Sequence, residues 1–249
     1  MYEMKTQVAY SQVNSELKAN MATIANFFQD CTLFHSEFVG KGLADVERRK
    51  RAWFLSSWQI QVIRYPEFKE EIIVRTWPHA FKGILGQRNF DILDADGNHI
   101  VQANSIWTFM DLEKMQPVKP SEEDLYGYDL EPPLDMGYAP RKIKELTTEF
   151  ELRMLPAPIR VGHTFLDSNH HVNNGRYVAE ALNYIPSKYT IKEMRVEYRK
   201  AAILDDVMFP AAYKNGNIWQ VALRDKDRKP YVIVEVQIEQ QGAGALGEM

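Results

Sequence analysis

The stretch "IQVIRYPEFKEEIIV" (residues 60–74) has the pattern of a strand, a charged turn and a second strand. The stretch "VEYRKAAILDDVMFP" (residues 196–210) shows the same pattern when it is placed beneath the first. The two stretches lie in different halves of a 249-residue chain. This repetition predicts two copies of one structural unit, with a period too long for a solenoid.

The segments around each stretch extend the repeat. In the first half, a helical pattern over residues 15–37 follows a short alternating stretch at Thr6–Tyr10. The apolar face of this helix carries Leu17, Met21, Ile24, Phe27, Phe28, Cys31 and Phe34. Strand patterns follow at residues 52–64, 71–77, 84–93 and 99–110. In the second half, a strand at 159–164 and a helix at 174–183 precede strands at 191–199, 206–213, 218–224 and 231–239.

This order, written twice, predicts an α+β fold in which each half wraps a curved antiparallel sheet around one helix. We expect the first unit to span residues 1–114 and the second to span residues 149–240. Residues 115–148 contain five prolines with glycine and clustered charges, which indicates a linker. Residues 241–249 are expected to form a disordered tail.

Composition excludes several classes of protein. The formal net charge of −4 argues against a broad surface for nucleic acid. Cys31 is the single cysteine, so an internal disulfide and a multi-cysteine metal site are excluded, and we expect a buried bystander. The start "MYEMKTQVAY" lacks the features of a signal peptide, and no apolar run is long enough for a bilayer. We therefore expect a cytoplasmic protein that binds neither nucleic acid nor membrane.

Polar side chains crowd the start of the second predicted helix, in "FLDSNHHVNNGRYVAEALNYIP" (residues 165–186). One explanation is structural, because Asn173 or Asn174 can cap a helix. The other is a functional site, favoured by a difference between the halves. Aligned on the helix starts, Asp167, Asn169 and His171 fall opposite Val13, Ser15 and Leu17, so the first half lacks the polar set.

These groups suit hydrolysis of an activated acyl group by water, without a cofactor. A helix N-terminus stabilises an oxygen that gains negative charge, and an asparagine amide can orient a carbonyl or a water. A histidine near a carboxylate can take a proton from water and return it to a leaving group. A metal site is disfavoured, because the adjacent His170 and His171 cannot easily point at one ion and no cysteine assists. Ser168 lacks the G-x-S-x-G context of a nucleophile.

The stretch "LDSNHHVNNGRYV" (residues 166–178) resembles the D-x-N-x-H-V-N-N-x-x-Y signature of the acyl-acyl-carrier-protein (acyl-ACP) thioesterases of plant plastids and bacteria. "SSWQIQVIRYPEFKEEIIVRTWP" (residues 56–78) is similar to a tryptophan-flanked strand pair of that family. "DADGNHIVQANSIWTFMDLEKMQPVKP" (residues 94–120) and "VEYRKAAILDD" (residues 196–206) match its later elements. The resemblance covers most of residues 10–240.

The resemblance implies a tandem hotdog fold and the hydrolysis of fatty acyl-ACP, in which the partner is acyl carrier protein with a phosphopantetheine-linked chain. Asp167, Asn169 and His171 match the catalytic Asp, Asn and His of the family. Our hypothesis is that His171 and Asp167 position and deprotonate water. The side chain of Asn169 and the backbone amides of Val172, Asn173 and Asn174 would orient the thioester carbonyl.

One departure from the family is informative. Plant members carry Glu-Cys where this chain has Ala201 and Ala202, so a cysteine nucleophile is impossible at this position. Glu197 shares the face of Ala201 but lies about 13 Å away along an extended strand, which makes it a poor substitute.

The family places its acyl slot in the first half, under the helix. Candidates for its lining are Phe27, Phe28, Trp53, Trp58 and Trp107, although any one of them could be core. Two alternatives to acyl-ACP hydrolysis remain: acyl-CoA hydrolysis by the same groups, and a non-catalytic acyl-binding or carrier-docking protein, suggested by the two alanines. A hotdog dehydratase fits the motif less well. A monomer and a homodimer are both compatible with this sequence.

Overall fold

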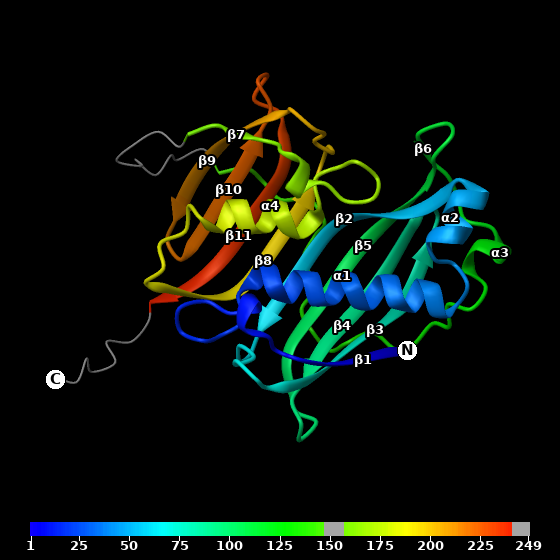
Figure 1. Cartoon of the computed structure of the whole chain (residues 1–249), viewed down its shortest axis with the longest axis horizontal. Coiled ribbons are helices and arrows are strands. Elements are labelled where there is room, and N and C mark those ends of the chain that lie inside the picture. The colour runs from blue at the N-terminus through cyan, green and yellow to red at the C-terminus, as the bar shows by residue number, and fades with distance from the viewer. Residues whose placement is uncertain (147–156, 241–249) are drawn as a thin grey trace, which may run out of the picture. The chain divides into compact units, whose positions relative to one another are not determined.

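The computed structural model describes residues 1–146 and 157–240. The chain divides into two compact units, Met1–Lys142 and Ile143–Met249. Each unit consists of antiparallel strands and one main helix that lies across them (Figure 1). The tail expected at residues 241–249 and most of the expected start of the second unit, residues 149–156, lie outside the described residues.

The first unit orders its main strands as β1-β3-β4-β5-β2, and each neighbouring pair is antiparallel. The strands are β1 (Tyr2–Gln7), β2 (Arg51–Val62), β3 (Glu71–Lys82), β4 (Leu85–Leu93), β5 (His99–Asp111) and the short β6 (Gln116–Pro117), which pairs with β5. The helices are the 3-10 turn η1 (Tyr10–Gln12), α1 (Met21–Phe38), α2 (Leu43–Arg49) and α3 (Glu122–Leu125). The four strands predicted after the first helix are confirmed, and β3 continues past its predicted end.

The second unit orders its strands as β8-β11-β10-β9-β7. Its elements are β7 (Ile159–Arg160), the 3-10 turn η2 (His163–Phe165), α4 (Asn174–Leu182), β8 (Tyr189–Tyr198), β9 (Val207–Asn215), β10 (Ile218–Arg224) and β11 (Pro230–Gln240). The predicted helix and four later strands are confirmed. The strand predicted at residues 159–164 is wrong in its second part, because the chain turns at Gly162 into η2.

The core of the first unit forms where the apolar face of α1 meets the strands. The Phe28 ring is fully buried, with its centroid 5.0 Å from that of Phe90 and 5.9 Å from that of Trp58. Cys31 is buried as expected, its thiol donates to the Val74 carbonyl at 3.4 Å, and burial raises its pKa to about 12. Leu17, assigned to this face from the sequence, is instead 49% exposed.

Helix α1 begins later than the sequence predicts. Residues 15–20 form a loop and a cap, and the Asn20 side chain accepts a hydrogen bond from the Thr23 amide at 2.9 Å. An asparagine in this position satisfies an amide that has no partner inside the helix. No helix within the described ranges is long and apolar enough to cross a membrane.

The two units repeat the same backbone hydrogen bonds around the start of the main helix. Equivalent donor–acceptor pairs, at 2.8 to 2.9 Å, are Ala19–Pro66 and Val172–Ala202, then Val8–Glu70 and Val161–Asp206. Pro66 and Ala202 also fall opposite each other when residues 60–74 are placed over residues 196–210. The repeat predicted from those two stretches is therefore present in the hydrogen bonding.

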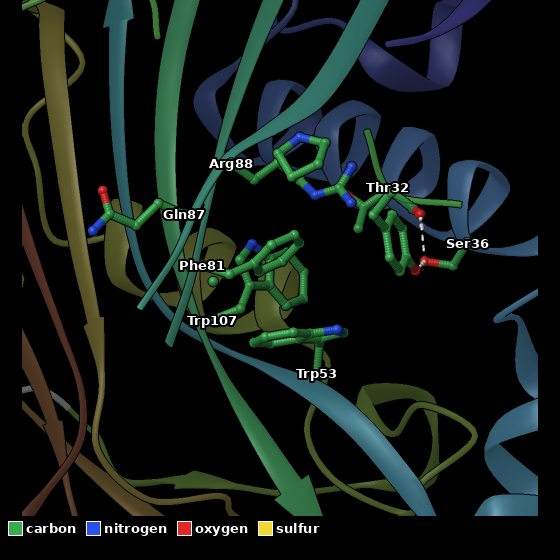
Figure 2. A pocket seen from close by; sticks show the side chains of 10 residues that line it. Thr32, Ser36, Trp53, Phe81, Gln87, Arg88 and Trp107 are labelled. Atoms are coloured by element: carbon green, nitrogen blue, oxygen red, sulfur yellow. Dashed lines mark hydrogen bonds between the residues drawn. The ribbon is translucent and has the colours of Figure 1, made fainter. Parts of the chain in front are cut away.

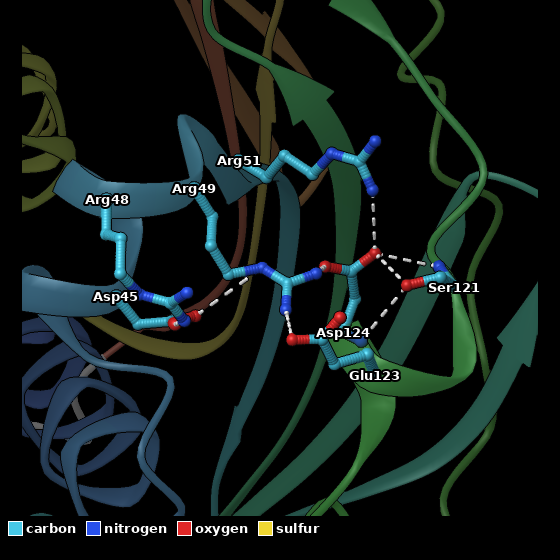
Figure 3. A network of polar contacts seen from close by, with 7 residues as sticks. All are labelled: Asp45, Arg48, Arg49, Arg51, Ser121, Glu123 and Asp124. Carbon is cyan, nitrogen blue, oxygen red and sulfur yellow. Dashed lines mark hydrogen bonds and ion pairs between the residues drawn. The ribbon is translucent and has the colours of Figure 1, made fainter.

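Residues 115–142, where the sequence predicts a separate linker, pack within the first unit. Asp124 of α3 forms ion pairs with Arg49 and Arg51 and accepts hydrogen bonds from Ser121 (Figure 3). The side chain of Gln59, on β2, exchanges two hydrogen bonds of 2.8 Å with backbone groups of the same segment. Residues 115–142 therefore belong to the first unit and do not form a separate linker, because their polar groups bind to residues of that unit.

His35, on the buried face of α1, generates a prediction about acid stability. Burial, with the nearby Arg88 cation, lowers the pKa of His35 to about 3, whereas an unfolded histidine titrates at about 6.5. Below pH 6.5 the unfolded chain therefore binds a proton that the folded unit does not bind. The free energy of unfolding falls as the pH falls towards 3, by about 2 kcal/mol between pH 6.5 and 5.

We expect urea unfolding of the first unit to need less denaturant at pH 5 than at pH 7. The variant His35→Gln should lose most of this difference, because glutamine keeps an acceptor for Arg88 but takes up no proton. The control His170→Asn changes an exposed histidine and should behave as the wild type. An unchanged pH dependence in His35→Gln would contradict the assignment.

Candidate functional site

The predicted catalytic residues form one tight loop between η2 and α4. Asp167 Oδ1 accepts the backbone N–H of Asn169 at 2.8 Å and that of His171 at 3.2 Å. The N–H of Asp167 in turn donates to the His171 carbonyl at 2.8 Å. The Asp167 side chain therefore fixes the backbone from which the other two side chains project.

The two adjacent histidines have different environments. His170 lies at the turn of the loop with a φ of 60°, in the left-handed region, and its side chain is exposed. His171 is half-buried and pairs through its backbone with Ile203. Asp167 is also half-buried, whereas Asn169 is exposed. Over the described ranges, no group of three His, Cys, Asp or Glu side chains is placed to hold a metal ion.

The start of α4 corrects part of the hypothesis. Asn173 is the helix cap, since its side chain accepts from the Gly175 amide at 2.8 Å. The Val172 amide donates to the Ala202 carbonyl at 2.9 Å, and the Asn173 amide to the Phe165 carbonyl at 2.8 Å. Neither amide can bind a substrate carbonyl without giving up a backbone hydrogen bond. The amides of Val172 and Asn173 are therefore not available to orient the thioester.

Asn174, the third residue expected to contribute an amide, is the first residue of α4. Its carbonyl accepts a hydrogen bond from the Tyr198 hydroxyl at 3.0 Å, which joins the helix start to β8. Burial raises the pKa of Tyr198, so the hydroxyl stays protonated and remains a donor. This contact holds the helix start against the sheet of the second unit.

The alanines that replace the family Glu-Cys lie beside the motif loop. Ala202 is fully buried, and its N–H donates to the Tyr177 hydroxyl of α4 at 2.7 Å. Glu197 is buried as well, but its carboxylate accepts the Ile143 amide at 2.9 Å and pairs with Arg199. These contacts agree with the interpretation that Glu197 does not substitute for the missing glutamate.

The first unit contains the same loop with other side chains. Asn14 Oδ1 accepts the N–H of Glu16 at 2.9 Å and that of Lys18 at 3.1 Å, and the Asn14 N–H donates to the Lys18 carbonyl at 2.8 Å. Leu17 has a φ of 58°, like His170. The hydrogen bonds of Asp167 are therefore a property of the repeated fold, and an amide oxygen serves equally well for them.

This equivalence shifts the alignment by one residue. The positions opposite Asp167, Asn169 and His171 are Asn14, Glu16 and Lys18, in place of Val13, Ser15 and Leu17. The alignment from the sequence was wrong by one residue, because it placed Asn174 opposite Asn20, whereas α4 begins at Asn174 and α1 begins at Met21. The first copy of the loop is also polar, so what distinguishes the second copy is a carboxylate at its first position, Asp167, and an imidazole at its last, His171.

A cavity lies in the first unit beside α1, lined by residues of that unit alone (Figure 2). It contains about 350 Å³ of empty space, part of it open to solvent, between the rings of Trp53, Phe81 and Trp107. A Cβ at Gly86 would lie 3.0 Å from the Trp53 ring, so glycine permits this wall. Of the five residues considered for an acyl slot, Trp53 and Trp107 line the cavity, and the buried core takes Phe27, Phe28 and Trp58.

Arg88 also lines this cavity, and sequence reasoning missed it. The available signal was its position in the strand predicted at residues 84–93. Arg88 shares a strand face with Gly86 and Phe90, so the alternation places a charge on the face that packs against the helix.

Comparison with known proteins covers both halves of the chain. The model of the acyl-ACP thioesterase N-terminal domain matches residues 1–128, and that of the C-terminal domain matches residues 153–239. The chloroplastic oleoyl-acyl carrier protein thioesterase 2 of Arabidopsis thaliana is 27% identical over 227 residues, which is 83% of this chain and 61% of that protein. The chain thus spans about three fifths of the length of this curated relative.

Solved structures show the same fold. A crystal structure of an acyl-ACP thioesterase from Bacteroides thetaiotaomicron aligns with a TM-score of 0.82 at 21% identity, over 95% of this chain and 97% of that one. The 12:0-ACP thioesterase from Umbellularia californica aligns with a TM-score of 0.81 at 19% identity, over 96% and 97% of the two chains. The predicted double hotdog fold is confirmed. Because the two domain models match in order along the sequence, the chain belongs to the acyl-ACP thioesterase family.

Proposed function

We propose that this protein hydrolyses the thioester between a fatty acyl chain and the phosphopantetheine of acyl carrier protein, releasing a free fatty acid and the carrier thiol. The match of both domain models carries the proposal. The loop that presents Asp167, Asn169 and His171 supports it, since it supplies a base, an amide and a carboxylate within five residues. A cytoplasmic location and a role in fatty acid biosynthesis belong to the same proposal.

The chemistry needs only water and this chain. His171 takes a proton from water, and the hydroxide adds to the thioester carbonyl carbon. The side-chain amide of Asn169 donates to the oxygen that becomes negative. When the C–S bond breaks, the imidazolium returns its proton to the leaving thiolate. Asp167 holds the loop through Oδ1, and its negative charge favours the imidazolium that forms.

The cavity of the first unit is the proposed place for the acyl chain. Its aromatic walls suit an apolar ligand, and each methylene buried there contributes about 0.8 kcal/mol. This assignment gives the second unit the reaction and the first unit the choice of chain, as the family resemblance implies.

The two histidines provide a matched test of the catalytic base. We expect His171→Ala to lower the turnover of acyl-ACP on the order of a hundredfold, because it removes the proposed proton acceptor. His170→Asn should stay within a few-fold of the wild type, since asparagine tolerates the left-handed backbone of that position. Initial rates and circular dichroism of both variants check this. Equal rates for the two variants would reject His171 as the base.

Asp167 can be tested separately for its charge and for its hold on the loop. Asp167→Asn should keep the loop, because Asn14 makes the same hydrogen bonds in the first unit. Asp167→Ala removes both the acceptor and the charge. We expect the asparagine variant to unfold like the wild type but to turn over on the order of a hundredfold more slowly. A nearly normal rate in Asp167→Asn would limit the role of Asp167 to holding the loop.

The activity itself is tested with acyl-ACP and acyl-CoA of one chain length, by following the release of free thiol. We expect faster release from the carrier-bound ester and a rate that falls with added salt, because the carrier is an acidic partner. Equal rates without salt dependence would favour the acyl-CoA alternative. Tight retention of fatty acid without thiol release would favour the non-catalytic alternative raised by Ala201 and Ala202.

A further inference from the structure

The cavity of the first unit combines aromatic walls with one buried cation. The rings of Trp53 and Phe81 stack with centroids 5.7 Å apart, and Trp107 adds a further wall (Figure 2). Arg88, on β4, lines the same cavity and is 7% exposed. An arginine at this depth loses most of its hydration, which is costly unless other groups take its place.

The guanidinium of Arg88 is only partly satisfied. Its Nη1 lies 2.9 Å from His35 Nδ1 and donates to Thr76 Oγ1 at 3.1 Å, and the group lies 5.5 Å from the ring centre of Tyr128. Within the described part of the chain, Nε and Nη2 have no hydrogen-bond partner. Neither atom is among the fully enclosed polar atoms that lack a partner, so both keep some accessible surface, and Arg88 is one of the residues that line the cavity.

The charge of Arg88 is also not neutralised by any side chain that the structure describes. No Asp or Glu among the described residues forms an ion pair with it. Burial lowers the pKa of Arg88 to about 10, which leaves the group a cation at neutral pH. His35 adds no charge beside Arg88, because burial lowers its pKa to about 3 and the imidazole is neutral at that pH. The cavity therefore combines one cationic lining residue with apolar walls.

A second arginine of the same unit shows what the Nε–Nη2 edge of a guanidinium binds. Arg75, on β3, directs Nε to Asp91 Oδ1 at 2.8 Å and Nη2 to Asp91 Oδ2 at 2.5 Å. Two parallel N–H groups match the two oxygens of a carboxylate, which gives both affinity and orientation. Among the described residues, no carboxylate binds the same Nε–Nη2 edge of Arg88.

We propose that this cavity binds an apolar monocarboxylate, with the carboxylate on the Nε–Nη2 edge of Arg88 and the chain along the aromatic wall. A free fatty acid has this chemistry. The further identification of the ligand with the product of the enzyme rests on the proposed function. In that case released acid turns its carboxylate to Arg88, whereas the thioester carbonyl of the substrate lies at the motif loop, and the acid competes with the next substrate for the cavity.

The test measures equilibrium binding without turnover, so a failure of the proposed hydrolysis does not affect it. Isothermal titration of the wild type compares decanoate with methyl decanoate and decan-1-ol, which share the chain but carry no charge. We expect decanoate to bind tenfold or more tightly, as a charge-assisted bidentate contact predicts. Equal affinities for the three ligands would overturn the proposal, and this comparison needs no variant.

Variants then place the carboxylate. Arg88→Gln should lower the affinity for decanoate tenfold or more, to that of the ester, and leave ester binding unchanged. Arg88→Lys keeps the charge without the paired donors and should show an intermediate loss. Arg195→Lys, the same change at a part-buried arginine outside the cavity, is the control and should bind as the wild type. A merely structural role of Arg88 would weaken acid and ester alike, which would count against the proposal.

Discussion

One side-chain oxygen sets the backbone before the main helix in each unit. It belongs to an amide in Asn14 and to a carboxylate in Asp167, and in both cases it accepts the N–H groups two and four residues later. These bonds compete with helix formation, so the helix starts only after the loop, at an asparagine cap. The start of the helix in turn determines which side chains face the sheet. The motif is therefore built on a turn that the fold needs in any case.

The four strands that follow the main helix of each unit could be predicted from the sequence because the local signals agree. Apolar alternation gives their extent, and turns such as Asn215–Gly216 give their ends, where Gly216 adopts a φ of 59°. The start of α1 could not be predicted, because Leu17 continues the helical spacing although Asn14 ties its backbone into a loop. Residues 115–142 were assigned to a linker because their partners, such as Gln59, lie far away in the sequence.

The candidate site shows a similar division. That Asp167, Asn169 and His171 act together stays a prediction from the sequence pattern, and the hydrogen bonds of the Asp167 side chain describe only the backbone of their loop. Which amides stay available could not be predicted, because the carbonyl of Ala202 takes the Val172 amide through tertiary structure. The same holds for Arg88. The residues next to Arg88 in the sequence do not indicate that it lacks an ionic partner. That lack, among the described residues, becomes visible only in the packing of β3, β4 and α1.

The equivalence of the two loops has a consequence for how the halves of such a protein diverge. Residues 14–18 and 167–171 follow one backbone path as long as the first residue supplies a side-chain oxygen, so the later side chains of either loop can be exchanged without remodelling the chain around it. After a gene duplication, point substitutions alone are then enough to give one copy chemistry and the other a purely architectural part. Foldability then constrains position 167, which must keep an oxygen acceptor, whereas the side chain of His171 can change with the reaction.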